Sequence, residues 1–204
     1  MSEAIIFFQI YNSNDVNFES CLSIYHVSFP DHEKQSETVI RERVDNGRSL
    51  LFAGRINDHI VCMCLIFDFK NSPFILLDYF AVSPVARVMG TGSKFMNFLI
   101  ERLIGKNRFL VMEVEHPEFG NNVTERRARI KFYERSGAWI LHNTRYLLPP
   151  LTDLSEPVEM QLMFLPKPVR QFSDLEIKDL ILTIYREVYN RQESDPVLLS
   201  FLKQ

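Results

Sequence analysis

Residues 74–93 read FILLDYFAVSPVARVMGTGS, and this stretch decides which fold we expect. Residues 74–82 form a nearly continuous apolar run, which is typical of a central strand buried on both faces. Ser83-Pro84 ends this strand, and apolar residues then spread over 93–104 in a helical pattern that is wider than one stripe. A buried strand, a short loop and a helix covered on more than one side therefore follow one another.

Two glycines, Gly90 and Gly92, lie where this helix begins. Because glycine has no Cβ atom, the backbone N–H groups there can approach a ligand closely, and a helix N-terminus offers free donors to phosphate. Arg87 adds a positive charge that can bind phosphate in a fork. A plain strand-to-helix turn would explain the same glycines. The loop is not the dinucleotide fingerprint, since Phe95 replaces its third glycine, and it is not a P-loop, since no G-K-[ST] follows.

The rest of the chain predicts strands and helices in alternation. We expect strands over 4–11, 49–55, 60–69, 109–115, 138–148 and 158–165. We expect helices over 21–29, 33–44, 125–135 and 175–189. Hairpins and crossover helices both occur in this order, which predicts an α/β (α+β mixed) fold with helices on the faces of a mixed sheet. We expect one domain over 1–165 and a C-terminal helical extension over 166–204, packed on that domain or exchanged with it.

Composition excludes several classes of protein. The 204 residues carry 23 Lys+Arg against 26 Asp+Glu, a net charge of −3, whereas a general nucleic-acid binder is clearly basic. No run reaches the roughly 18 uncharged apolar residues that a membrane helix needs. The apolar run at 4–10 lacks the basic flank and cleavage site of a signal peptide. With three cysteines in no framework spacing, we expect a cytoplasmic protein with reduced thiols.

No metal site is expected. Cys62 and Cys64 share a face of a predicted strand, but no second cysteine pair or nearby histidine cluster completes a metal or redox site, so we expect buried thiols. The remaining histidines are isolated, with no metal-ligand spacing, at positions 26, 32, 59 and 142. The basic residues over 126–135 are diluted by glutamates, which indicates a solvated helix face rather than a nucleic-acid surface.

A second motif, KFYERSGA at 131–138, follows about forty residues later. With it the chain resembles the GNAT (GCN5-related N-acetyltransferase) superfamily, whose members use acetyl-CoA. The family's pyrophosphate loop, [RQ]-x-x-G-x-[GA], matches Arg87, Gly90 and Gly92. Its later helix, ending F-Y-x-x-x-G-F, matches Phe132, Tyr133 and Gly137, and its strand ending A-V-x-P matches Ala81, Val82 and Pro84.

The resemblance has departures. Val88 and Met89 stand where many relatives have glycine and a basic or polar residue, and Ala138 replaces an aromatic residue. Arg126 and Arg129 stand where relatives carry asparagine and a small residue, so either arginine could meet a phosphate of coenzyme A or an acidic substrate.

The resemblance implies a GNAT fold, with a mostly antiparallel sheet splayed between strands four and five. It implies that the backbone of Phe80, Ala81 and Val82 pairs with the pantetheine arm, and that the Val82 N–H meets the thioester oxygen. It implies that pyrophosphate is wrapped by the amides of Val88, Met89, Gly90, Thr91, Gly92 and Ser93. Arg126 and Tyr133 complete the expected cofactor-binding residues.

The attacking amine must lose a proton, so the resemblance also implies a base. The family-like position on strand five favours Glu113, then Glu115, while Asp78, His116 or a water chain are alternatives. The alternative to a catalytic role is that one or both glutamates are solvated or form ion pairs with Arg126, Arg127 or Arg129. Tyr133 matches the tyrosine that protonates the leaving thiolate in many relatives, and a core aromatic is its alternative.

We therefore expect an acetyl-CoA-dependent N-acetyltransferase that modifies a primary amine of a small molecule or peptide by direct attack in a ternary complex, without metal, nucleic acid or membrane. A homodimer is the family-level expectation for its assembly. The alternatives are a non-catalytic acyl-CoA-binding module with a regulatory role and a CoA-independent α/β fold. The acceptor itself has no recognisable motif.

Overall fold

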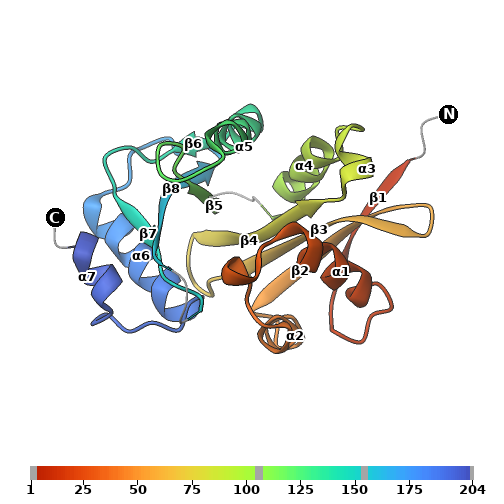
Figure 1. Ribbon diagram of the computed structural model, residues 1–204, viewed down its shortest axis with the longest axis horizontal. Helices are drawn as coiled ribbons and strands as arrows, with labels where there is room; N and C mark the ends of the chain where they lie inside the picture. Colours follow the sequence, from red (N-terminus) through yellow and green to blue (C-terminus); the bar gives the residue numbers. More distant parts are fainter. Residues whose placement is uncertain (1–3, 104–107, 153–155, 203–204) are drawn as a thin grey trace. The chain divides into compact units, whose positions relative to one another are not determined.

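The computed structural model describes residues 4–103, 108–152 and 156–202 (Figure 1). The chain forms a mixed α/β structure that divides into two compact units. The N-terminal unit extends to Arg108, and the C-terminal unit begins at Phe109. The domain over 1–165 and the extension over 166–204 stay predictions.

The N-terminal unit is built on four antiparallel strands in the order β1-β2-β3-β4. Their bounds are Ile5–Ile10 (β1), Ser49–Ile56 (β2), His59–Asp68 (β3) and Phe74–Val82 (β4). These bounds confirm the predicted strands. The strands form here because their apolar residues are buried in the core. Asn57, with φ 51°, makes the tight turn between β2 and β3.

Helices cover both faces of these strands. Their bounds are Phe18–Ser28 (α1), Glu37–Asp45 (α2), Pro84–Arg87 (α3) and Thr91–Leu103 (α4), with a 3₁₀ turn, η1, at Asp31–Glu33. Figure 1 shows α1 and α2 on one face and α3 and α4 on the other. The expected helix over 33–44 begins later because the Ser36 side chain caps α2 by accepting the N–H of Val39.

Strand β4 carries a β-bulge that changes its local register. Leu65 pairs with Tyr79, but the next residue, Ile66, pairs with Leu77. Asp78 is therefore the extra residue on β4, which bends a strand at this point and redirects its side chains.

The C-terminal unit contains the two predicted strands β5 (Phe109–Glu115) and β8 (Val158–Leu165), which pair antiparallel to each other. The expected single strand over 138–148 is wrong at its centre, since it consists of two short strands, β6 (Trp139–Ile140) and β7 (Tyr146–Leu148), which both pair with β8. The break arises because Asn143 adopts φ 63°, which no continuous strand accommodates.

The helices of this unit are α5 (Val123–Arg135), α6 (Asp174–Glu187) and α7 (Pro196–Leu202). No sequence pattern had indicated α7. Ser173 and Glu176 form a capping box that starts α6. The Tyr185 hydroxyl donates to the Leu147 carbonyl at 2.5 Å, and Arg191 Nη2 donates to the Pro150 carbonyl at 2.6 Å. The C-terminal helices therefore pack onto the β7 region.

Candidate active site

The end of β4 leads directly into the loop that the sequence singles out. Val82 pairs with Cys62, and the Ser83 N–H then donates to the Val61 carbonyl at 2.8 Å. Arg87 turns back toward this strand end, where its Nε donates to the Val82 carbonyl at 2.9 Å. This contact fixes the direction of an exposed arginine beside the start of α4.

The loop amides fall into two groups. The N–H groups of Met89 and Gly90 donate to the carbonyls of Ala86 and Arg87, at 3.2 and 3.3 Å. The first helical bond of α4 runs from Lys94 N–H to the Gly90 carbonyl at 3.1 Å. The amides of residues 91–93 precede that bond, so the helix itself supplies them with no acceptor. Residues 91–93 therefore offer donors directly, whereas Met89 and Gly90 would have to exchange their present partners.

Gly90 has a backbone reason to be glycine. Its φ is +67°, in the left-handed region, and a Cβ placed there would meet no atom within 4 Å. The positive φ, rather than lack of space, is therefore what favours glycine at the turn into α4.

Asp78, the bulge residue of β4, is a buried carboxylate in the N-terminal unit. Its side chain is 5% exposed, and Arg43 Nη1 lies 3.6 Å from its Oδ2, which has no hydrogen-bond partner among the described residues. The Arg43 guanidinium also lies over the Phe67 ring, 5.2 Å from its centroid. Burial raises the pKa of Asp78 to about 6, while the charge of Arg43 acts in the opposite direction.

Two tyrosine hydroxyls hold the segment between α1 and α2 next to β4. Tyr79, which follows Asp78, accepts the Gln35 N–H and donates to the Glu33 carbonyl, both at 3.0 Å. Tyr25 donates to the Gln35 carbonyl at 3.0 Å. Burial raises the pKa of Tyr25 to about 12, so its hydroxyl stays a donor at neutral pH.

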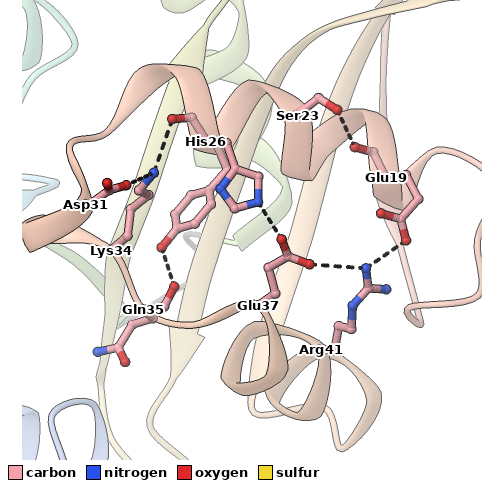
Figure 2. Close-up of polar contacts among 9 residues, drawn as sticks. Glu19, Ser23, His26, Asp31, Lys34, Gln35, Glu37 and Arg41 are labelled. Carbon is pink, nitrogen blue, oxygen red and sulfur yellow. Dashed lines mark hydrogen bonds and ion pairs between the residues drawn. The ribbon is translucent and has the colours of Figure 1, made fainter.

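Charged side chains join α1 to α2 on the surface of the same segment (Figure 2). Arg41 lies 2.8 Å from Glu19 and 3.7 Å from Glu37, which in turn is 2.8 Å from His26 Nε2. Lys34 pairs with Asp31 at 2.7 Å. These contacts cross-link the two helices and the segment between them.

Glu113, on β5 of the C-terminal unit, is held by two tyrosines. The Tyr146 hydroxyl donates a short hydrogen bond to Oε1, and the Tyr189 hydroxyl donates to Oε2 at 2.6 Å. Burial, reinforced by the charge of Glu113, raises the pKa of Tyr146 well above its usual range. Both carboxylate oxygens therefore accept hydrogen bonds from neutral hydroxyls.

Glu115 is held instead by arginines of α5. Its oxygens lie 2.7 Å from Arg126 Nη2 and 2.8 Å from Arg129 Nη1. Arg126 Nη1 also donates to the His116 carbonyl at 3.2 Å. Glu115 thus adopts the ion-paired arrangement that was the alternative to its role as a base.

Tyr133 lies near the end of α5 and is buried. Its ring contacts that of Phe132 at a centroid distance of 5.2 Å, and its carbonyl accepts the N–H groups of Ser136 and Ala138 at 3.0 Å each. Gly137 follows the C-cap residue Ser136 with φ +92°, a left-handed conformation in which glycine commonly ends a helix.

The predicted site residues are thus placed in two groups. Phe80, Ala81, Val82 and residues 87–93 belong to the end of β4, the loop and α4 of the N-terminal unit. Glu113, Glu115, Arg126 and Tyr133 belong to β5 and α5 of the C-terminal unit.

A further feature of the C-terminal unit that was not predicted is a hollow of about 280 Å³. Its lining is His116, Leu141, His142, Asn143, Thr144, Arg145, Glu159, Met160 and Gln161. The polar run at 142–145, inside a predicted strand, was the sequence signal for this hollow.

Across the described parts of the chain there is no cluster of three or more His, Cys, Asp or Glu that could hold a metal ion. No helix in those parts combines the length and the apolar character needed to cross a membrane.

Comparison with known proteins identifies the family. The model of the acetyltransferase (GNAT) family matches residues 18–138, and the chain belongs to this family. A Bacillus subtilis (strain 168) protein assigned as an acetyltransferase, YjbC, is 34% identical over 124 residues. That match covers 59% of this chain and 55% of the relative, so the chain spans about half the length of YjbC.

Solved structures show the GNAT fold. A Bacteroides thetaiotaomicron protein assigned as a GNAT acetyltransferase superimposes with a TM-score of 0.77 at 24% identity, over 92% of this chain and 99% of that one. A GNAT acetyltransferase from Elizabethkingia anophelis, solved with acetyl-CoA bound, has a TM-score of 0.53 at 13% identity, over 80% of this chain and 98% of that one.

Proposed function

We propose that the protein transfers an acetyl group from acetyl-CoA to a primary amine of a small molecule or peptide, by direct attack in a ternary complex. One observation carries this proposal. In a chain of the GNAT family, the amides of Thr91, Gly92 and Ser93 stand ahead of the first helical bond of α4, with Arg87 beside them. The acetyl-CoA bound to the Elizabethkingia anophelis relative supports it.

The residues after β4 fit a diphosphate. Three first-turn amides and the positive end of the α4 dipole favour an anion. Within the described residues Arg87 uses its Nε on the Val82 carbonyl, so its two Nη groups are available to donate to a phosphate. The backbone of Phe80, Ala81 and Val82 would hold the pantetheine arm, and a Val82 N–H set before the reaction would stabilise charge on the thioester oxygen.

The contacts of the three carboxylates support a base other than Glu113, which the family resemblance favours. Glu115 is paired with two arginines, and both oxygens of Glu113 accept tyrosine hydroxyls. Asp78 has a pKa raised to about 6, and its Oδ2 has no hydrogen bond from any described residue, so it can accept a proton near neutral pH. We assign the base role to Asp78, with Glu113 as the alternative, and keep Tyr133 as the donor to the leaving thiolate.

A non-catalytic acyl-CoA-binding module is the second candidate. The observation that favours it is that Glu113 and Glu115, the two carboxylates on β5, are both engaged in contacts within the chain. Release of free thiol from acetyl-CoA with a panel of primary amines separates the two candidates. Turnover that Tyr133→Phe abolishes supports the enzyme, whereas tight CoA binding without turnover on any amine supports the module.

Calorimetry with acetyl-CoA tests the binding site itself. Gly92→Ala adds a methyl group in the first turn of α4, and we expect it to weaken binding at least about tenfold because the amides can no longer approach the phosphates. Alanine is a better helix former than glycine, so loss of the helix would not explain such a result. The control is Asn97→Ala on the exposed face of α4, which should bind like the wild type. Wild-type protein that takes up no acetyl-CoA would overturn the proposed function.

The pH profile tests the base. We expect the wild-type rate to fall as the pH drops below about 6, because Asp78 then carries a proton. Asp78→Asn should lower the rate by two or more orders of magnitude and remove this limb of the profile. A normal rate in Asp78→Asn, with loss of rate in Glu113→Gln, would move the role to Glu113.

A further inference from the structure

The hollow in the C-terminal unit exists because the strand opposite β8 bulges. Ile140 pairs with Met163 and Tyr146 pairs with Met160, so the five residues 141–145 face only two residues of β8, Gln161 and Leu162. The Leu141 N–H still donates to the Leu162 carbonyl at 2.8 Å, after which the chain turns away through Asn143. The surplus residues line the space together with residues of β8.

A buried acceptor in the wall of this hollow lacks a hydrogen bond. Gln161 lines the hollow, and its Oε1 is covered from water without a partner among the described residues. Leaving such an atom unpaired is costly, because neither the protein nor solvent replaces the hydrogen bond lost on burial. A small rotation of the side-chain amide would present this oxygen to the N–H of a bound molecule.

A donor lies in the same wall. The backbone N–H of Glu118 donates to His116 Nδ1 at 3.2 Å, so Nδ1 is the acceptor nitrogen of the ring. The proton is then on Nε2, which can donate to a carbonyl oxygen. His116 and Gln161 together offer one N–H donor and one carbonyl acceptor, the complement of an amide group.

The rest of the lining fits a neutral ligand with an apolar part. Arg145 and Glu159 neutralise each other in a forked ion pair, with Nε and Nη2 each 3.1 Å from a carboxylate oxygen. Leu141 and Met160 supply apolar surface. A volume of about 280 Å³ is at the small end for ligand pockets, which suits one or two amino-acid residues.

We propose that this hollow is a peptide-binding site: it receives a backbone amide between His116 and Gln161 and an apolar side chain against Leu141 and Met160. The proposal does not depend on acetyl transfer, since all of the lining belongs to the C-terminal unit.

The test is a titration of the full chain, followed by NMR, with N-acetyl-leucine N-methylamide as the probe. We expect weak, saturable binding that shifts the Gln161 side-chain amide and the His116 ring signals. N-acetyl-leucine methyl ester lacks the second N–H and should bind at least about fivefold more weakly. Equal binding of the ester, no shift at either residue, or displacement of the probe by sulfate would overturn the proposal.

Two variants of the hollow and one control at an exposed position separate loss of binding from loss of folding. Gln161→Met keeps the length of the side chain but removes the acceptor, so it should lose probe binding while melting at the same temperature or higher. Gln171→Met makes the same change at an exposed position and should bind like the wild type. Thr144→Tyr fills the hollow without changing Gln161 and should also block the probe. Undiminished binding in both Gln161→Met and Thr144→Tyr would place the probe elsewhere and refute the site.

Discussion

The hydroxyl of Tyr189, just after α6, donates a 2.6 Å hydrogen bond to Oε2 of Glu113 on β5, 76 residues earlier in the chain. The contact ties the C-terminal helix to one of the candidate bases. It also means that the environment of Glu113 depends on a segment outside the residues 18–138 that match the family model.

Tyr189→Phe removes that hydroxyl and leaves Glu113 with the hydrogen bond from Tyr146. Because the acceptor is a carboxylate, we expect the free energy of unfolding to fall by about 1–3 kcal/mol, measured by urea denaturation. Tyr11→Phe, at an exposed tyrosine, should change it by less than about 0.5 kcal/mol. Equal stability of the Tyr189 and Tyr11 variants would contradict the contact.

Asp78→Asn should be more stable than the wild type at neutral pH, and this advantage should depend on pH. The folded protein raises the pKa of Asp78 from 3.8 to about 6, so the folded state binds this proton more tightly than the unfolded state does. The free energy of unfolding of the wild type therefore falls by up to about 3 kcal/mol as the pH rises from about 4 through 6. The Asp78→Asn variant does not show this fall, because asparagine does not titrate.

Urea denaturation of both proteins at pH 4.5 and 7.5 measures this difference. Asp58→Asn makes the same change at an exposed turn residue and serves as the control. An advantage of Asp78→Asn that is the same at both pH values would contradict the raised pKa of the buried carboxylate.

The two arginines that hold Glu115 should contribute unequally. The Arg126 side chain is 13% exposed and that of Arg129 is 49% exposed, although their distances to the carboxylate are 2.7 and 2.8 Å. Arg126→Ala should lower the free energy of unfolding by about 2–4 kcal/mol, because Glu115 loses its shielded partner, whereas Arg129→Ala should cost under about 1 kcal/mol. Thermal unfolding of the two variants tests the order, and equal losses would show that burial does not distinguish them.

The capping box at the start of α6 should also contribute to stability. Ser173 Oγ accepts the N–H of Glu176 at 3.3 Å, so Ser173→Ala should cost about 1 kcal/mol by chemical denaturation. Arg170 and Ser173 lower the pKa of Glu176 to about 2, so its favourable contribution is present above about pH 4.5 and is lost as the pH falls toward 2. Ser20→Ala, at an exposed serine of α1, is the control.

Much of the fold was predictable because its signals are local. The apolar run at 74–82 and the apolar spread of the next helix are patterns between residues close in sequence. Strand β4 forms where predicted and α4 begins two residues before its predicted start, whereas the short helix α3 lies where a loop was expected. The hydrophobic pattern predicted the other long strands for the same reason. The loop motif and the FYERSG motif were also local, and they were enough to indicate the family that the comparison confirms.

The sequence by itself determined the order of the long strands and helices as far as α6, and it indicated the family. Tertiary structure decided the state of each carboxylate: burial with an unsatisfied oxygen for Asp78, two hydroxyl donors for Glu113 and two arginines for Glu115. It also decided the bulges at Asp78 and at 141–145 and hence the hollow over β8. The physical reason is that hydrogen bonding, desolvation and register depend on groups far away in the chain, which local patterns of polarity do not specify.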